Sequence, residues 1–268
     1  MKHKLFFRGL LLLAFLSTSG FLFAQKTETR NVSGFSAIEA GSVFEITVNK
    51  SATESLVIEA DEKVLPHVRS EVKNGVLKLY LDGKVTNVKT LKATIGMKEL
   101  KKIALSGACK LVSNDMFNVP TFDMDLSGAC SAKLNIKTDK LNVDASGACK
   151  LDLVAEARKA TFDASGSSRL TLRLTAAEAF FDVSGACKAD IKGRADKAVF
   201  DVSGACNINA GEWACKVVSA DCTGASKLTL NVSERLNVDA SGASAISYKG
   251  RPIINVETSG TSKVKSAD

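Results

Sequence analysis

The sequence predicts an all-β solenoid in which one chain winds as a single-stranded parallel β-helix, with about 19 residues per coil. After residue 105 the dipeptide Ser-Gly, once Thr-Gly, occurs nine times at nearly constant spacing, and apolar and polar residues alternate on both sides of it. The nine units begin at Ser106, Ser127, Ser146, Ser165, Ser184, Ser203, Thr223, Ser241 and Ser259, with successive spacings of 21, 19, 19, 19, 19, 20, 18 and 18 residues. A fixed period of this length is typical of stacked coils, and period-two alternation is typical of strands.

Aligning the units on the Ser column predicts the core. Coils of equal length place equivalent residues above one another, so each column has one environment. The columns one and three positions before the Ser, and five and seven positions after it, are apolar, and strand alternation turns such residues to one side. The column three positions before the Ser contains Ile103, Met124, Val143, Phe162, Phe181, Phe200, Ala220, Val238 and Val256. We expect these columns to form a continuous apolar spine.

Each coil is expected to contain two short strands that meet at the Ser-Gly bend. Glycine suits a bend because it adopts positive φ without a Cβ clash. The only prolines are Pro66, Pro120 and Pro252, and none interrupts a Ser-Gly unit. Upstream, alternating runs at 43–48, 56–60, 75–81 and 91–95 predict strands. We expect residues 25–105 to cap the solenoid and continue into it, and residues 106–268 to form its repeats.

Charged residues also fall into columns. Two positions before the Ser stand Asp125, Asp144, Asp163, Asp182, Asp201, Asp221, Asp239 and Glu257. Four positions after it stand Lys110, Lys150, Arg169, Lys188, Lys227 and Lys263. Stacked like charges repel, so we interpret the two rows as adjacent and mutually neutralising parts of a solvated surface. The alternative that the Asp column collects Ca²⁺ stays open, although the glycine-rich Asp nonapeptide of calcium β-rolls is missing.

The seven cysteines fit a structural role best. Three positions after the Ser, cysteine alternates with serine in one inward column, made of Cys109, Cys130, Cys149, Ser168, Cys187, Cys206, Ser226, Ser244 and Ser262. Such exchange indicates a site that needs a small side chain. Disulfides are the main alternative in an exported protein, with Cys215 and Cys222 as a candidate pair outside the column. A soft-metal site is disfavoured because no column supplies histidine. We expect no cofactor and no metal site.

The N-terminus predicts export. Residues 1–24 combine Lys2, Lys4 and Arg8 with a following apolar stretch that ends at Ala24, as in a cleaved secretory signal. An uncleaved membrane anchor is the alternative, but the apolar stretch is short for a spanning helix. Removal of the leader lowers the formal net charge from +7 by three, to +4, which weakens the case for nucleic-acid binding. We expect no membrane span in the mature chain.

Three motifs carry a resemblance to a known family. They are Arg30-Asn-Val-Ser-Gly-Phe-Ser-Ala-Ile38, Asn74-Gly-Val-Leu-Lys-Leu79, and Leu100-Lys-Lys-Ile-Ala-Leu-Ser-Gly-Ala108 leading into the Ser-Gly-Ala-Cys/Ser units. Together they resemble the head GIN domain family, described as autotransporter-type adhesins of Gram-negative bacteria. The resemblance covers nearly all of the mature chain and implies an exported right-handed β-helix. It supplies no catalytic residue, and cysteine in the small-residue column departs from the family pattern.

A non-catalytic binding module of the cell envelope or surface, adhesin-like, is therefore the favoured function, with a glycan or cell-surface ligand as partner. A β-helix enzyme acting on polysaccharide is the first alternative, but such an enzyme needs a local cluster of acid and base residues. The only histidine after the leader is His67, and we assign no catalytic, cofactor, metal or ligand-binding residue. The irregular coil around Trp213 is the first candidate contact if that indole is exposed. A self-associating envelope scaffold is the second alternative; we expect a monomer or weak homo-oligomer, in the periplasm, on the outer membrane or outside the cell.

Overall fold

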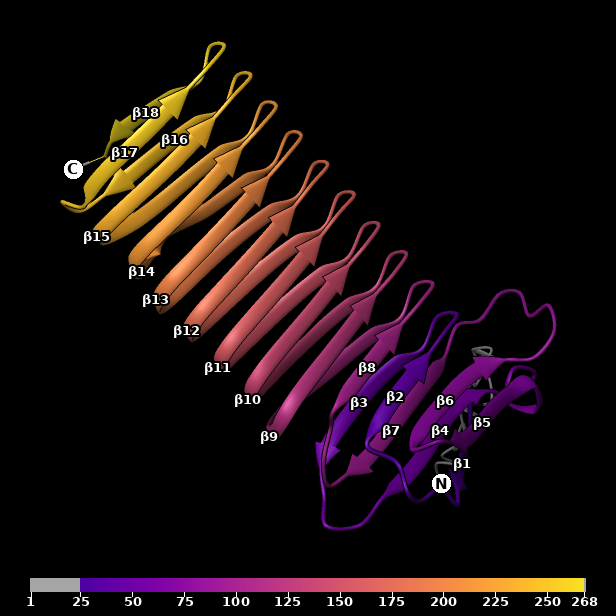
Figure 1. Cartoon of the computed structure of the whole chain (residues 1–268). Helices are drawn as coiled ribbons and strands as arrows, with labels where there is room; N and C mark the ends of the chain where they lie inside the picture. Colours follow the sequence, from indigo (N-terminus) through magenta and orange to yellow (C-terminus); the bar gives the residue numbers. More distant parts are fainter. Residues whose placement is uncertain (1–24, 268) are drawn as a thin grey trace, which may run out of the picture.

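The computed structural model describes residues 25–267; the predicted signal segment, residues 1–24, lies outside the described residues. The chain winds as a right-handed parallel β-helix in the form of a straight rod (Figure 1). One 3-10 turn, η1 (Leu65–His67), interrupts a structure otherwise made of strands and connecting turns. The predicted all-β solenoid of about 19 residues per coil is confirmed.

Eighteen strands make up the described chain. The N-terminal strands are β1 (Gln25–Arg30), β2 (Ala37–Ala40), β3 (Glu45–Lys50), β4 (Ser55–Asp61), β5 (Val68–Lys73), β6 (Val76–Leu81), β7 (Leu91–Met97) and β8 (Lys102–Leu105). The solenoid strands are β9 (Lys110–Leu126), β10 (Ser131–Ala145), β11 (Lys150–Ala164), β12 (Arg169–Val183), β13 (Lys188–Val202), β14 (Asn207–Cys222), β15 (Lys227–Ala240), β16 (Ala245–Lys249), β17 (Ile253–Thr258) and β18 (Lys263–Ser266).

Vertical registration is the central feature of the rod. Val143 pairs with Phe162, Phe162 with Phe181, and Phe181 with Phe200, all in parallel ladders. The three phenyl rings are buried and stack with centroids 5.0 and 4.8 Å apart. Equivalent residues of successive repeats therefore lie above one another, as the column alignment predicts.

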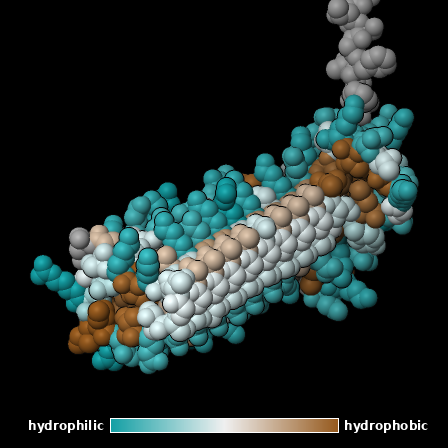
Figure 2. Space-filling model, turned by 90° about the horizontal axis from the view of Figure 1, so that it is seen from above, coloured by the Kyte–Doolittle hydropathy of each residue, from teal (hydrophilic) through white to brown (hydrophobic). Residues whose placement is uncertain are grey.

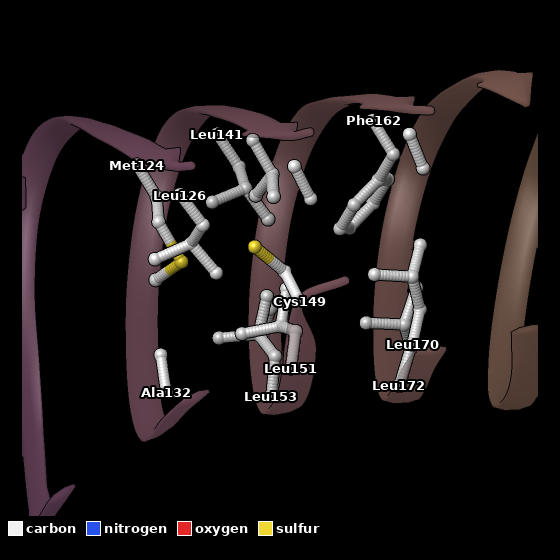
Figure 3. Close-up of a cluster of buried hydrophobic side chains, with 14 of the residues drawn as sticks. Met124, Leu126, Ala132, Leu141, Cys149, Leu151, Leu153, Phe162, Leu170 and Leu172 are labelled. Atoms are coloured by element: carbon white, nitrogen blue, oxygen red, sulfur yellow. The ribbon is translucent and has the colours of Figure 1, made fainter. Parts of the chain in front are cut away.

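Each coil is flattened, with two facing walls. In Figure 3, Met124, Leu126 and Phe162 project inward from one wall. Leu151 and Leu170 project inward from the opposite wall, and the two sets fill the space between them. We call the wall formed by the first half of each coil, which follows the Ser-Gly unit, the Lys face, and the wall formed by the second half the Asp face. The core is one apolar column that runs along the rod.

The Ser-Gly corner is a tight turn stacked on the turn of the coil before it. The corner glycines from Gly107 to Gly260 have φ between 69° and 93°. The amide of Ala148 donates to the Gly128 carbonyl at 2.8 Å, and the same bond recurs in the following coils. A Cβ on Gly166 would lie 2.5 Å from the Gly147 carbonyl oxygen. Glycine is thus required both for the backbone conformation and for close stacking.

The other corner differs from the expectation of two short strands. β11 runs without a break from Lys150 to Ala164 and bends near Ala157, where one residue is skipped in the pairing with its neighbours. No glycine or proline marks this second corner in the aligned coil of β10, which turns at Thr138. A bend within a hydrogen-bonded strand needs only a small inward side chain, so it leaves no strong mark in the sequence.

The N-terminal strands continue the winding and close one end of the rod. β2 pairs in parallel with β8 and β6, and β3 pairs in parallel with β7 and β9. β4 and β1 add antiparallel strands beyond β7, and β5 adds one beyond β6. The four upstream runs correspond to β3, β4, β6 and β7, whereas β1, β2, β5 and β8 were not expected as separate strands.

Candidate functional site

The Asp column forms a ladder on the outside of the Asp face. Asp144 pairs in register with Asp163, Asp163 with Asp182, and this pairing continues to Glu257. We call this column, from Asp125 to Glu257, the Asp ladder. Neighbouring strands of a sheet lie about 4.8 Å apart, which sets the spacing of its carboxylates.

A row of uncharged side chains accompanies most of the ladder on the same face. It lies four positions before each Ser and comprises Asn142, Thr161, Phe180, Val199, Ser219, Asn237 and Asn255, which are in register from coil to coil. We call it the central row. Towards the C-terminal end the two rows border a shallow hollow of about 340 Å³, lined in part by Asp201, Asp221, Asp239, Ser219, Asn237 and Asn255. The face therefore combines carboxylate acceptors with amide donors in a regular array.

A third row borders the central row on its other side. It contains Lys140, Lys159, Glu178, Lys197, Val217 and Arg235. The ammonium group of Lys159 lies over the ring of Phe180, 4.7 Å from its centroid. The central row is thus a strip of amide, hydroxyl, aromatic and aliphatic groups between a negative row and a mostly positive one. Sequence reasoning misses these two rows because the aligned columns stop three positions before the Ser.

The ladder's charges affect one another. Partial burial, and next the negative charges of Asp163 and Asp201, raise the pKa of Asp182. Partial burial and the charges of Asp201 and Asp239 likewise raise the pKa of Asp221. No cation contributes to either pKa shift, so the charged groups that affect these two carboxylates are other members of the Asp ladder.

The interpretation of adjacent, neutralising charge rows is wrong. The Lys row lies on the Lys face and the Asp ladder lies on the Asp face, because the Ser-Gly corner between them reverses the direction of the chain. Among the described residues no ion pair joins the two rows. Lys188 instead lies 3.8 Å from Asp190 on its own face. The two walls consequently present different charge patterns to solvent.

The cysteine column is buried, as predicted. The Cys149 thiol donates to the Ser146 carbonyl at 3.2 Å, and the Ser168 hydroxyl donates to the Ser165 carbonyl at the same distance. Cysteine and serine exchange in this column because both are small and both satisfy the same turn carbonyl. Burial raises the pKa of the Cys109 thiol to about 11, well above the ordinary range of a reactive thiol.

The candidate disulfide between Cys215 and Cys222 does not form. Cys215 lies at the second corner, aligned with Ala195, whereas Cys222 lies beside the Ser-Gly corner, aligned with Val202. The two therefore occupy opposite edges of one coil. All seven cysteines are free and buried in the structure.

Trp213 is buried, so it is not the exposed contact that the sequence left open. Its indole N–H donates to the carbonyl of Leu174, two coils below, at 2.9 Å. The indole ring crosses the intervening coil at Gly193, which pairs with Trp213 and has no side chain to block it. Its edges contact the rings of Phe181 and Phe200. The longer coil around Trp213 thus serves packing.

His67 lies apart from the Asp ladder, beside the N-terminal loop. Its Nδ1 atom lies 3.0 Å from the carbonyl oxygen of Asp82. A general base must be within hydrogen-bond reach of the group it activates, and no carboxylate is paired with this ring among the interactions of residues 25–267. No group of three or more His, Cys, Asp or Glu side chains able to hold a metal ion occurs in that part of the chain.

A smooth ridge separates the two faces along one edge of the rod. In Figure 2 it is the pale, even band that runs nearly the full length of the solenoid, flanked by hydrophilic side chains. It consists of the stacked Ser-Gly-Ala corners, whose side chains are small. The rod therefore offers a narrow uncharged edge and two broad charged walls.

Fold and surface together define a β-solenoid repeat protein with two broad charged faces. The chain belongs to the head GIN domain family. The family model, described as "Putative auto-transporter adhesin, head GIN domain", matches residues 34–191 and again 154–252. No curated protein matches the chain.

Solved structures share the fold. A "putative adhesin" from Parabacteroides distasonis has a TM-score of 0.72 at 19% identity, and the match covers 91% of this chain and 97% of that one. A "putative adhesin" from Parabacteroides merdae has a TM-score of 0.68 at 20% identity, with 91% and 96% covered. A "putative lipid binding protein" from Parabacteroides distasonis has a TM-score of 0.69 at 18% identity, with 91% and 97% covered.

Proposed function

We propose that this chain is an exported, non-catalytic β-helix module of the cell envelope or surface, which binds a glycan or another cell-surface ligand through its Asp face. Membership of an adhesin-described family supports the binding role, and the leader-like residues 1–24 support export. Within residues 25–267 no helix is long and apolar enough to cross a membrane.

The observation that carries the proposal is the Asp face itself. Carboxylates accept hydrogen bonds from hydroxyl groups, and the amides of Asn237 and Asn255 both donate and accept. In the hollow, these groups stand beside the Asp ladder at coil spacing. A linear polymer with repeated hydroxyl groups could engage several coils at once, and simultaneous weak contacts raise the overall affinity. A single deep pocket is not needed for such binding.

A glycan array tests this proposal, with the chain lacking residues 1–24 as the probe. We expect binding to a subset of glycans, and expect Asp239→Ala with Asn237→Ala to abolish it. Asp152→Ala, on the Lys face, is the matched control and should leave binding unchanged. Equal binding by both variants, or no glycan binding at all, would contradict a glycan site on the Asp face.

A polysaccharide-acting enzyme is the alternative to exclude. The same glycans should be incubated with the protein and assayed for new reducing ends. Binding without release supports a non-catalytic module, whereas release that Asp239→Ala abolishes would assign catalysis to the Asp face and overturn the proposal.

A further inference from the structure

Exposed large hydrophobic side chains gather at the C-terminal edge of the described solenoid. In residues 25–267 they are Val43, Tyr80, Met116, Ile253, Ile254 and Val256, so three of the six lie in β17. Ile253 is the most exposed, at 74%. Figure 2 shows a hydrophobic patch at this end of the rod and a second one at the end formed by the N-terminal strands.

The same edge has unused pairing capacity. Among the described strands β17 pairs with β15, and β18 pairs with β16, each along one side only. Val256 lies above buried Val238, and Val264 lies above buried Ile246. The edge therefore presents both strand backbone and the end of the apolar core. The edge of β17, whose only charged residue is Glu257, is a template for pairing with another chain, whereas Lys263 and Lys265 protect the edge of β18 in part.

The strand edges at the opposite end of the rod carry more charge. Its outermost strands are β1 and β5, each paired along one side only among the described strands. β1 carries Lys26, Glu28 and Arg30, and β5 carries Arg69, Glu71 and Lys73. Charged side chains on an edge strand disfavour pairing because pairing would desolvate them. The C-terminal edge thus fits another C-terminal edge better than it fits the N-terminal end, which favours a closed pair over a growing filament.

We propose that two copies of this chain join end to end through their C-terminal edges, with β17 of each copy antiparallel to β18 of the other. A two-fold axis through the Gly260 corner gives a register that keeps inward residues opposite inward residues. Val256 then faces Val264 of the second copy, and the apolar core becomes continuous across the pair. The outward residue Glu257 faces Lys263 of the second copy, so each interface contains two opposite-charge pairs.

Charge selects this arrangement over the other two-fold possibility. If β17 paired with its own copy, β18 would also pair with its own copy, and Lys263 would face Lys265 of the second chain. Like charges directly opposite each other in a sheet are destabilising, whereas opposite charges are favourable. Only two strand edges and the side chains between them are available, so we expect a dimer that dissociates on dilution.

Sedimentation velocity over a wide range of protein concentrations tests the proposal. The chain lacking residues 1–24 should change from monomer to an elongated dimer as concentration rises. Glu257→Lys should weaken the dimer at least tenfold, because it places Lys opposite Lys263 of the second copy. Lys263→Glu should do the same, and the double variant Glu257→Lys with Lys263→Glu should restore association.

Asp239→Lys is the matched control, since it makes the same charge reversal in the same column one coil away from the edge. It should leave the dissociation constant within about threefold of the parent. All changed residues are exposed and outward, and thermal unfolding of each variant verifies that the rod still folds. A monomer at every concentration, or a dimer that the double variant fails to restore, would overturn the proposal.

Discussion

At the residue scale, each corner glycine meets two requirements, positive φ and the absence of a Cβ. Ser42 shows that the two requirements are independent. It has φ 75°, and its carbonyl accepts a hydrogen bond from the amide of Ala108. The carbonyls of the later corner glycines accept the equivalent bond from the coil that follows each of them. A side chain is thus tolerated at the first corner position of the winding. At later corners, the carbonyl of the corner residue in the preceding coil occupies the space that a Cβ would need.

This distinction predicts different costs for two glycine substitutions. Gly34 has φ 76° and nothing within 4 Å of the place where a Cβ would lie, whereas Gly166 has φ 77° and a carbonyl oxygen 2.5 Å from that place. We expect Gly34→Ala to lower the free energy of unfolding by about 1–2 kcal/mol, the cost of the left-handed conformation alone. Gly166→Ala should cost clearly more, as measured by urea unfolding. Equal costs would show that stacking at the corner is unimportant.

The thiols give a second prediction at this scale. All seven are buried, and burial raises the pKa of Cys215 to about 11 and that of Cys222 to about 12. The native protein should therefore react with a maleimide at pH 8 at none of its thiols, and the unfolded protein at all seven. Folding raises the pKa of the Cys222 thiol from 9.0 to about 12. The contribution of this neutral thiol to the free energy of unfolding is therefore fully present below about pH 9 and is lost as pH rises toward 12. Full labelling of native protein would contradict the burial.

At the scale of elements, the coil of β14 shows how an insertion is absorbed. The register shifts between Asp190 and Lys192 on β13, and the extra length lets Trp213 turn inward. Gly193 provides the gap and Leu174 the hydrogen-bond acceptor. Three consecutive coils thus cooperate to bury one large side chain.

Substitution of this sole tryptophan tests that cooperation. Trp213→Ala should lower the free energy of unfolding by about 3–5 kcal/mol, as for other buried aromatic residues. Trp213→Phe keeps part of the packing but leaves the Leu174 carbonyl without its donor, so we expect about 1–3 kcal/mol. Unfolding is followed by circular dichroism. A cost below about 1 kcal/mol for Trp213→Ala would be inconsistent with the buried position.

At the scale of the whole molecule, the Asp ladder spreads like charge along one wall of the rod. A carboxyl pKa raised by folding means that the folded state holds the proton more tightly than the unfolded state. The contribution of such a carboxyl group to the free energy of unfolding is therefore greatest at acid pH and declines as pH rises through its pKa in the folded state. At neutral pH the charges of Asp182 and Asp221 therefore oppose folding.

Removing one charge should therefore stabilise the rod. We expect Asp182→Asn to raise the free energy of unfolding at pH 7 by a few tenths of a kcal/mol, since the carboxylate is largely exposed. The gain should vanish near pH 3 and shrink in high salt. Asp190→Asn is the control, because Asp190 lies near Lys188 and its loss should not stabilise. A stabilisation that is independent of pH would refute the charge explanation.

Much of the architecture could be predicted from the sequence, whereas the candidate surface could not. The repeat fixes coil length, and alternation fixes which side chains face inward, as the Phe162, Phe181 and Phe200 stack confirms. The family resemblance is likewise confirmed. The sequence does not state how sharply the chain turns at the Ser-Gly bend, and so it could not assign the Lys row and the Asp ladder to different walls.

By itself, then, the sequence determined the local preferences of this protein: corner conformation, strand alternation and the vertical neighbours of each residue. These follow from the covalent spacing of side chains along a regularly wound chain. Tertiary structure alone decided which rows share a wall and whether Trp213 faces solvent or core. Those outcomes depend on contacts between coils, such as the bond from Trp213 to Leu174 across 39 residues, and local pattern does not encode such contacts.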